Sequence, residues 1–220
     1  MIFSDPRIHA LDQLYAVYDR LTDAREVACK KFCAVCCTCN VTLTSLEAHR
    51  IIAALDDNAK QTIREKLKNQ LERPRFIPKL TINQLADICV KGEDPPDEDM
   101  DPAWGACPLL DDNACTIYDD RPFGCRCMTS VQKCSDTGAA DIDEFTLTIN
   151  HVFLQTIEHI DINGYFGNLS DMLAEVWTGI NAGSNPLHLI RNAPLSALLV
   201  PPEHREKIQP ILTAIRAIRM

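Results

Sequence analysis

The chain is poor in glycine and carries no long hydrophobic run and no excess of positive charge. Eight glycines and 13 prolines in 220 residues exclude collagen-like and low-complexity structure. No stretch approaches the roughly 20 apolar residues that span a bilayer, and the N-terminus lacks the basic start and apolar run of a signal peptide. The net charge of -9 disfavours a general nucleic-acid binder and an anionic lipid surface as partners. The sequence therefore predicts a cytoplasmic globular protein with no nucleic-acid and no membrane partner.

Several common active-site motifs are also missing. The sequence contains no GxGxxG, GxxxxGK[ST], GxSxG or HExxH, which removes the usual nucleotide-dependent and hydrolytic enzymes. The six histidines are scattered without metal-ligand spacing, and only His49 lies near a group of cysteines in the sequence. An ordinary surface or core role is therefore expected for each histidine.

Cysteine, in contrast, is abundant and clustered. The 11 cysteines form two groups with Cys89 alone between them: Cys29, Cys33, Cys36, Cys37 and Cys39, then Cys107, Cys115, Cys125, Cys127 and Cys134. In a reducing compartment such clustering indicates metal or redox chemistry more often than a disulfide framework. We therefore predict that thiolates from the two groups gather around one metal centre. Cys89 lies in an apolar, helix-like run and is expected to be a small buried hydrophobe.

Thiolate is a soft ligand that selects zinc, iron–sulfur clusters or copper(I). The Cys33-x-x-Cys36 spacing allows both sulfurs to reach one centre. The adjacent pair Cys36-Cys37 is harder to place on a single ion, because neighbouring side chains diverge in most backbone conformations. This pair modestly favours an iron–sulfur cluster over a structural zinc, although both cofactors stay open. Cys39, Cys127 and Cys134 are either bystanders or members of a second site.

The periodicity predicts a mainly α protein, in which a helical domain carries a small cysteine-rich β-hairpin and loop unit that forms the metal site. Helices are expected near the N-terminus, from Thr44, from Asp57 to before Pro74, over 79–89, 141–160, 169–177 and 203–218. The segments 107–110 and 115–118 flank Asp111, Asp112 and Asn113 as the strands of a hairpin would. Residues 91–102 indicate an exposed acidic loop. We expect a metal-binding region at 1–136 and a helical region at 137–220, packed together as one domain.

The two cysteine groups resemble the YkgJ-type cysteine-cluster family, whose members are described as zinc- or iron-chelating domains of the CxxCxxCC kind. The matching segments are CKKFCAVCC (29–37), VTLTSLEAHRI (41–51) and CPLLDDNACTIYDDRPFGCR (107–126). A flagellin lysine methylase is similar in its cysteine motif, which implies an iron–sulfur possibility. The resemblance covers under half of the chain and implies metal binding without a defined reaction.

The resemblance implies six metal ligands: Cys33, Cys36, Cys37, Cys107, Cys115 and Cys125. Three residues separate Cys29 from Cys33 where the family has two, which puts Cys29 in doubt, and Cys39 and Cys127 are additional to the pattern. Arg121 and Arg126 are candidate cofactor-binding residues, either for cluster sulfurs or for an anionic substrate. The structural alternative pairs them with nearby aspartates. Tyr118 and Phe123 are expected to shield the centre from water.

Three functions stay open at this point. The leading one is a metal-binding protein that holds zinc or an iron–sulfur cluster, with its physiological task and any protein partner unassigned. The second is a metal- or cluster-dependent enzyme of redox or group-transfer chemistry. The third is a protein-interaction module whose metal only ties a loop-rich segment to the helices.

Overall fold

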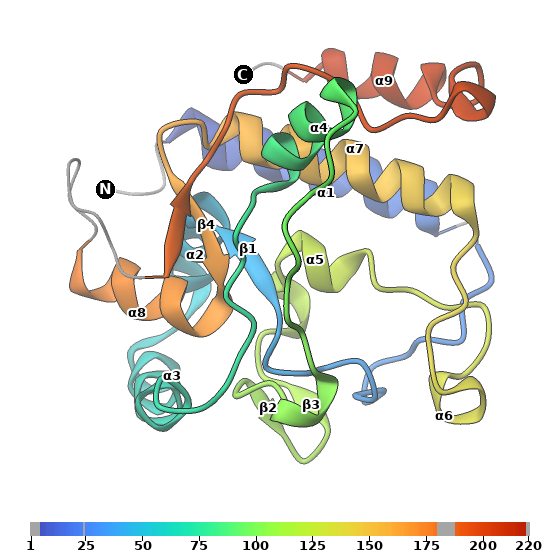
Figure 1. The fold of residues 1–220 in the computed structure, drawn as a ribbon. Coiled ribbons are helices and arrows are strands. Elements are labelled where there is room, and N and C mark those ends of the chain that lie inside the picture. Colours follow the sequence, from blue (N-terminus) through green and yellow to red (C-terminus); the bar gives the residue numbers. More distant parts are fainter. Residues whose placement is uncertain (1–4, 24, 180–187, 219–220) are drawn as a thin grey trace.

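The computed structural model describes residues 5–23, 25–179 and 188–218, and this part of the chain is mainly helical, as predicted (Figure 1). The helices are α1 (Pro6–Thr22), α2 (Ser45–Ala54), α3 (Asp57–Gln70), α4 (Ile82–Lys91), α5 (Phe123–Arg126), α6 (Cys134–Thr137), α7 (Glu144–Ile160), α8 (Leu169–Thr178) and α9 (Gln209–Arg216). Short 3-10 helices cover Pro102–Trp104, Tyr118–Asp120 and Pro202–His204. The strands are β1 (Thr42–Thr44), β2 (Leu110–Asp111), β3 (Ala114–Cys115), β4 (Tyr165–Asn168) and β5 (Leu189–Arg191). Among the described residues, no helix combines the length and the apolar character needed to cross a membrane.

The helix ends follow local rules that were visible in the sequence. Thr44 and Glu47 form the predicted capping box at the start of α2, and Asp56 caps α3 by accepting from the backbone of Ala59. The predicted helix over 79–89 begins later, at Ile82, because Thr81 forms a capping box with Gln84. Since side-chain caps satisfy backbone N–H groups that the helix cannot, they fix these start points.

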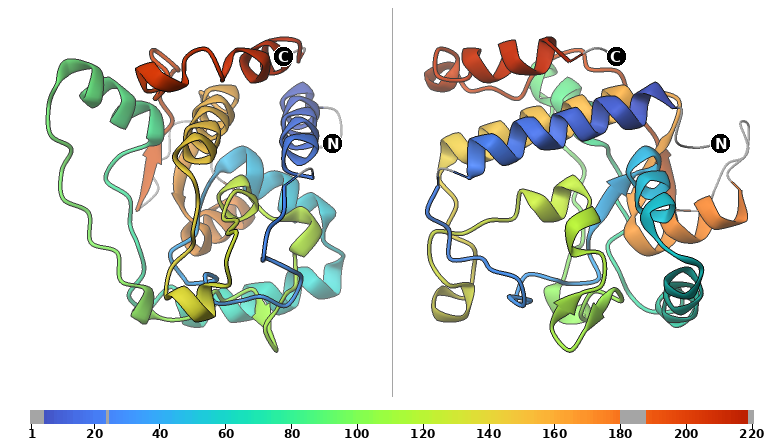
Figure 2. Two further views of the ribbon diagram at one scale, coloured as in Figure 1. Left: turned by 90° about the vertical axis from the view of Figure 1, so that its right-hand side faces the viewer. Right: turned by 180° about the vertical axis from the view of Figure 1, so that it is seen from behind.

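Two hydrophobic clusters hold the helices together. The first contains apolar side chains of α1, α7 and α9 with Phe123 from α5, and Figure 2 shows α1 and α7 side by side with α9 across them. The second joins β1, α2, α3 and α8 with Leu109 and Ile117 on either side of the β2–β3 hairpin. Residues from both predicted regions, 1–136 and 137–220, contribute to both clusters.

A three-stranded antiparallel sheet, which the sequence did not predict, links the two regions. Its order is β1-β4-β5, with Leu43 opposite Gly167 and Gly167 opposite Leu189. A side chain at Gly167 would place its Cβ 2.3 Å from Cδ2 of Leu189, so a larger residue here would require the Leu189 side chain to move. The strands have three or four residues each, too few for alternation to be recognised.

Asp161, at the end of α7, ties this helix to α2. Its Oδ2 accepts hydrogen bonds from Ser45 Oγ at 2.5 Å and from the Leu46 backbone at 3.0 Å, and Arg7 lies 3.4 Å from its Oδ1. Burial raises the pKa of Asp161 to about 6, although the Ser45 hydrogen bond acts in the opposite direction. Because the folded pKa exceeds the unfolded one, the stability that Asp161 contributes is present below the unfolded pKa and is lost as pH rises through the folded pKa.

The Asp161→Asn substitution should remove this pH dependence. We expect the difference in unfolding free energy, wild type minus variant, to fall between about pH 4 and about pH 7 by up to about 3 kcal/mol. Denaturant titrations at both pH values measure this difference. Asp57→Asn, at a fully exposed position, is the control and should show no such fall. A difference that is flat or that rises with pH for Asp161→Asn would contradict the assignment.

Candidate metal centre

Backbone hydrogen bonds join the two cysteine groups directly. Thr38 and Ala106 form an antiparallel bridge, the Cys107 backbone N–H donates to Cys37 O at 2.9 Å, and the Cys39 N–H donates to Gly105 O at 2.9 Å. Segments about 70 residues apart in the sequence thus run side by side. Main-chain hydrogen bonds therefore bring Cys37 close to Cys107.

The first cysteine segment is a series of tight turns. The Cys33 N–H donates to Lys30 O at 2.9 Å and the Cys37 N–H donates to Ala34 O at 3.0 Å. Phe32 lies in the left-handed region with φ 77°, which is uncommon for a bulky residue. These turns supply the special local geometry that the adjacent pair Cys36-Cys37 requires to reach one cavity.

The second segment contains the predicted hairpin in a shorter form than expected. Strands β2 and β3 pair Leu110 with Cys115 around a two-residue turn at Asp112 and Asn113, which have φ 44° and 63°. Asp and Asn tolerate this left-handed conformation better than most residues, and it suits the twist of a tight hairpin. The hairpin carries Cys115 back toward the residues that precede β2.

Cys125 is positioned by α5, and α5 is held by a buried phenylalanine. Phe123 is fully buried, 4.7 Å from the Tyr18 ring centroid and stacked 5.5 Å from that of Phe153. Its backbone N–H donates to Glu47 Oε1 at 2.7 Å. The expectation that Phe123 shields a metal centre is therefore wrong, because its ring belongs to the helical core. Tyr118 does line the cysteine cavity.

Glu47 connects α1, α2 and α5 through one buried carboxylate. It accepts from Tyr15 Oη at 2.7 Å and from the Phe123 backbone through Oε1, and from the backbone and hydroxyl of Thr44 through Oε2. Glu47→Gln replaces one accepting oxygen with an amide donor, so two donors lose their acceptor. We expect the unfolding free energy to fall by about 2 to 3 kcal/mol, measured by denaturant titration. Glu65→Gln, on the exposed face of α3, is the control; equal losses in both variants would contradict the role of Glu47.

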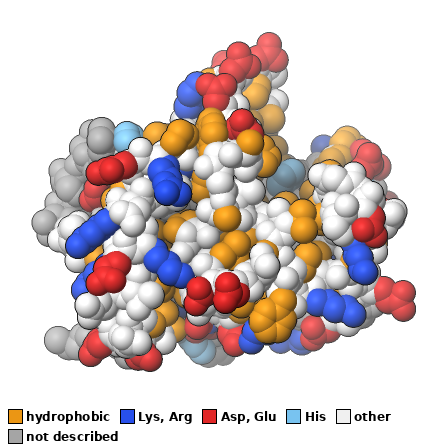
Figure 3. Space-filling model, turned by 90° about the horizontal axis from the view of Figure 1, so that it is seen from below, with side chains coloured by type: hydrophobic (Ala, Val, Ile, Leu, Met, Phe, Trp, Pro, Cys, Tyr) orange, Lys and Arg blue, Asp and Glu red, His pale blue; other side chains and the backbone are white. Residues whose placement is uncertain are grey.

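Eight cysteines line one cavity of about 100 Å³. All six predicted ligands are among them, and Cys29 and Cys134, which the sequence left undecided, complete the set. The remaining lining residues include Phe32, Tyr118, Arg121 and Lys30 but no Asp, Glu or His. Figure 3 views the molecule from below, the side on which the hairpin lies in Figure 1, and shows hydrophobic side chains there among charged ones. A wall of thiols without carboxylates fits a thiophilic metal and does not fit calcium or magnesium.

Three cysteines lie outside this cavity. Cys39 is buried with its Sγ 3.7 Å from Pro74 O, and Cys127 belongs to the core cluster that contains Phe123. Cys89 is exposed on α4, so the prediction of a buried hydrophobe is wrong: this helix turns Asn83 and Ala86 inward instead. His49 is also absent from the cavity lining.

Burial and hydrogen bonding give the cavity thiols unequal acidities. The Cys37 thiol donates to the sulfur of Cys36, which lowers the pKa of Cys36 to about 6, helped by the Arg121 guanidinium. The pKa of Cys37 is raised by that hydrogen bond and by burial. Burial raises the pKa of Cys107 to about 11 and also raises that of Cys125. Since metals bind thiolates, loading this cavity must release protons.

The two arginines predicted to bind a cofactor have different surroundings. Arg121 lines the cavity, stacks 3.7 Å from the Tyr118 ring centroid and donates to Tyr118 O at 2.7 Å. Arg126 is not among the lining residues: it packs 4.6 Å from the Tyr15 ring centroid and lies 3.6 Å from Asp19. Arg121 thus brings a fixed positive charge to the thiols, whereas contact of Arg126 with a bound group stays a prediction.

The cavity thiols surround a space and do not meet at one point. Within the described residues, no three His, Cys, Asp or Glu side chains are grouped as the ligands of one metal ion would be. Four thiolates about 2.3 Å from one zinc ion stand about 3.8 Å from one another. A single structural zinc would therefore require these side chains to move closer together.

Comparison with known proteins identifies a family. Residues 28–146, more than half of the chain, match the family model CxxCxxCC, described as a putative zinc- or iron-chelating domain. Searches of the curated proteins and of the solved structures found no match. The matched range begins just before Cys29 and includes every cysteine that lines the cavity, and the chain therefore belongs to the CxxCxxCC family.

Proposed function

We propose that this protein binds a polynuclear metal centre, an iron–sulfur cluster in the first place, through thiolates from its two cysteine segments. The ligands are drawn from Cys33, Cys36, Cys37, Cys107, Cys115 and Cys125. Cys29 and Cys134 are near enough to serve a second metal position or to replace a ligand. The proposal includes a cytoplasmic location, because free thiols persist in a reducing compartment. The physiological task and any protein partner are left unassigned.

One observation carries the proposal: eight cysteines, from two segments joined by the hydrogen bond between Cys107 N and Cys37 O, line a single cavity. Four thiolates satisfy one tetrahedral zinc ion, so eight exceed what one ion can use. A water molecule needs roughly 10 to 15 Å³ of cavity volume. The volume of about 100 Å³ therefore has room for a group of several atoms. A cluster also takes its thiolates on different iron atoms, which suits side chains that surround a space.

Zinc is the second candidate, because zinc and iron both appear in the description of the family. Metal analysis and absorbance of anaerobically purified protein separate the two. The proposal predicts iron and acid-labile sulfide in equal amounts, with a visible absorbance that dithionite bleaches. If the analysis finds one equivalent of zinc and no iron, the protein has a structural zinc site and no cluster. A folded protein with neither metal after anaerobic purification would overturn metal binding altogether.

Alkylation of thiols provides an independent test at the level of single residues. In the loaded protein, iodoacetamide should modify Cys89 and leave the cavity cysteines protected, because ligated thiolates are not free to react. After chelation, Cys33 and Cys36, both exposed, should become reactive within the time that Cys89 requires. Cys89 is the internal control, since it is exposed and lies outside the cavity. Equal labelling of Cys33, Cys36 and Cys89 before chelation would contradict the ligand assignment.

A further inference from the structure

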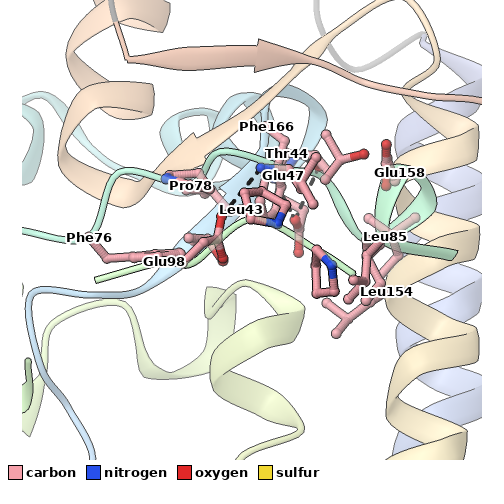
Figure 4. Close-up of a pocket in the computed structure, with 17 residues that line it drawn as sticks. Leu43, Thr44, Glu47, Phe76, Pro78, Leu85, Glu98, Leu154, Glu158 and Phe166 are labelled. Atoms are coloured by element: carbon pink, nitrogen blue, oxygen red, sulfur yellow. Dashed lines mark hydrogen bonds between the residues drawn. The ribbon is translucent and has the colours of Figure 1, made fainter. Parts of the chain in front are cut away.

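A second cavity, more apolar than the first, lies between β1, α4, α7 and the loop that follows α4 (Figure 4). Its volume is about 380 Å³, within the size range of small-molecule sites. Figure 4 shows Phe76, Pro78 and Glu98 on one side and Leu85, Leu154 and Glu158 on the other. The cavity is distinct from the cysteine cavity and shares no lining residue with it.

One wall of this cavity is the acidic loop that the sequence predicted as exposed. Pro95, Pro96 and Glu98 line the cavity, and Figure 2 shows the loop as an extended trace that descends from α4. Lys79 fixes it in place: its Nζ donates to Asp97 O at 2.6 Å and its backbone N–H donates to Glu98 Oε1 at 2.6 Å. Two successive prolines restrict the backbone further, so this wall is formed before any ligand arrives.

All the charged residues that line this cavity are acidic. Glu47, Glu98 and Glu158 line the cavity, and no Lys, Arg or His does. The hydrogen bonds of Glu47 are taken up by Tyr15, Thr44 and Phe123, as described above, so this residue has a structural role. Glu98 and Glu158 are the two other carboxylates on the lining.

Among the described residues, Glu98 keeps one free carboxylate oxygen, whereas both oxygens of Glu158 already accept hydrogen bonds. Glu98 Oε1 accepts from the backbone of Lys79 and Leu80, while its Oε2 makes no hydrogen bond to the described residues. Glu158 is 1% exposed and accepts from the backbone of Asn83 at 2.9 Å, from the backbone of Ala193 at 2.6 Å and from the Thr81 side chain. Burial raises the pKa of Glu158, and a cation in the cavity would stabilise its charged form.

We propose that this cavity binds a small organic cation, an alkyl- or aryl-ammonium compound whose apolar body fills the space between Phe76 and Leu154. The ammonium group is held at Glu98, on the side of the loop. An anionic ligand would face unpaired carboxylates with no cation to balance it. A neutral apolar ligand would gain the same burial without the ionic attraction. The lining therefore favours a ligand that combines a positive charge with an apolar body.

Three probes with one apolar frame and different charges test the proposal: phenethylamine, 2-phenylethanol and phenylacetate. Isothermal titration calorimetry on the full chain should show phenethylamine binding about fivefold more tightly than 2-phenylethanol, since a partly exposed ion pair contributes this much. Phenylacetate should bind more weakly than both. Glu98→Gln should abolish the preference for the amine. Asp97→Asn is the matched control on the same loop, because its side chain does not line the cavity, and it should keep the preference.

Leu85→Trp tests the location, because the larger side chain fills the cavity and should remove binding of all three probes. Leu154→Phe is the alternative if that variant does not fold. Metal content should be unchanged in every variant, which separates this proposal from the cysteine centre. The proposal is overturned if phenethylamine binds no better than 2-phenylethanol or does not bind at all. Equal losses in Glu98→Gln and Asp97→Asn, or full binding in a folded cavity-filling variant, would also overturn it.

Discussion

Replacing Cys37 and Cys107 together with serine is expected to lower metal affinity by more than about a hundredfold, since losing even a residue that only hydrogen-bonds to a metal ligand costs ten- to hundredfold. Serine keeps the size of the side chain but removes the soft anionic sulfur. The backbone hydrogen bond between these two residues does not involve their side chains, so the segments should stay joined. Metal content after anaerobic reconstitution measures the effect. Cys89→Ser, outside the cavity and exposed, is the matched control and should bind metal normally; an equal loss there would contradict the assignment.

The first cysteine segment is expected to depend on the proposed metal for its order, and the helical core is not. The first cysteine segment has little apolar burial of its own: Phe32 is 66% exposed and Val35 57% exposed. The α1–α7 core, in contrast, contains fully buried Leu11, Leu14 and Phe153. Metal loss should therefore loosen the turns over 29–37 and leave the helical core folded, because metal binding and local order are coupled.

Local sequence signals predicted the helical part well. The α1 helix follows from apolar residues at helical spacing, α2 from the Thr44–Glu47 capping box, and the end of α3 at Gln70 from the proline at position 74. The hairpin also follows from local chemistry, since Asp112 and Asn113 provide the left-handed turn. Each of these features depends on residues within a few positions of one another, which is the range over which backbone sterics and capping act.

Long-range features were harder to predict. The β1–β4 pairing joins Thr42 to Asn168, and nothing in such short strands specifies a partner so far along the chain. The six cysteines proposed as ligands from the resemblance all line the cavity. Cys29 and Cys134 line it as well, but only because of the path that the chain takes after α5. For Cys29, the Ala28 backbone N–H donates to Ser130 O at 2.8 Å, a contact that spacing alone could not indicate.

Phe123 shows how a residue inside the cysteine motif can serve the core. Its motif neighbours suggested a role at the metal, yet its ring packs against Tyr15, Tyr18 and Phe153. Cys125 follows two residues later, on the same turn of α5. The core thereby sets the position of one proposed ligand, which explains why an aromatic residue stands there.

Phe123→Ala is accordingly expected to lower the unfolding free energy by about 4 kcal/mol, because a fully buried ring leaves a cavity in the core. The variant should also bind metal more weakly, since α5 loses the anchor that places Cys125. Denaturant titration measures the first effect and metal content the second. Phe32→Ala is the matched control: the same substitution at a 66% exposed ring should change stability by less than about 0.5 kcal/mol. If the two variants lost similar stability, the core would not be what holds α5 in place.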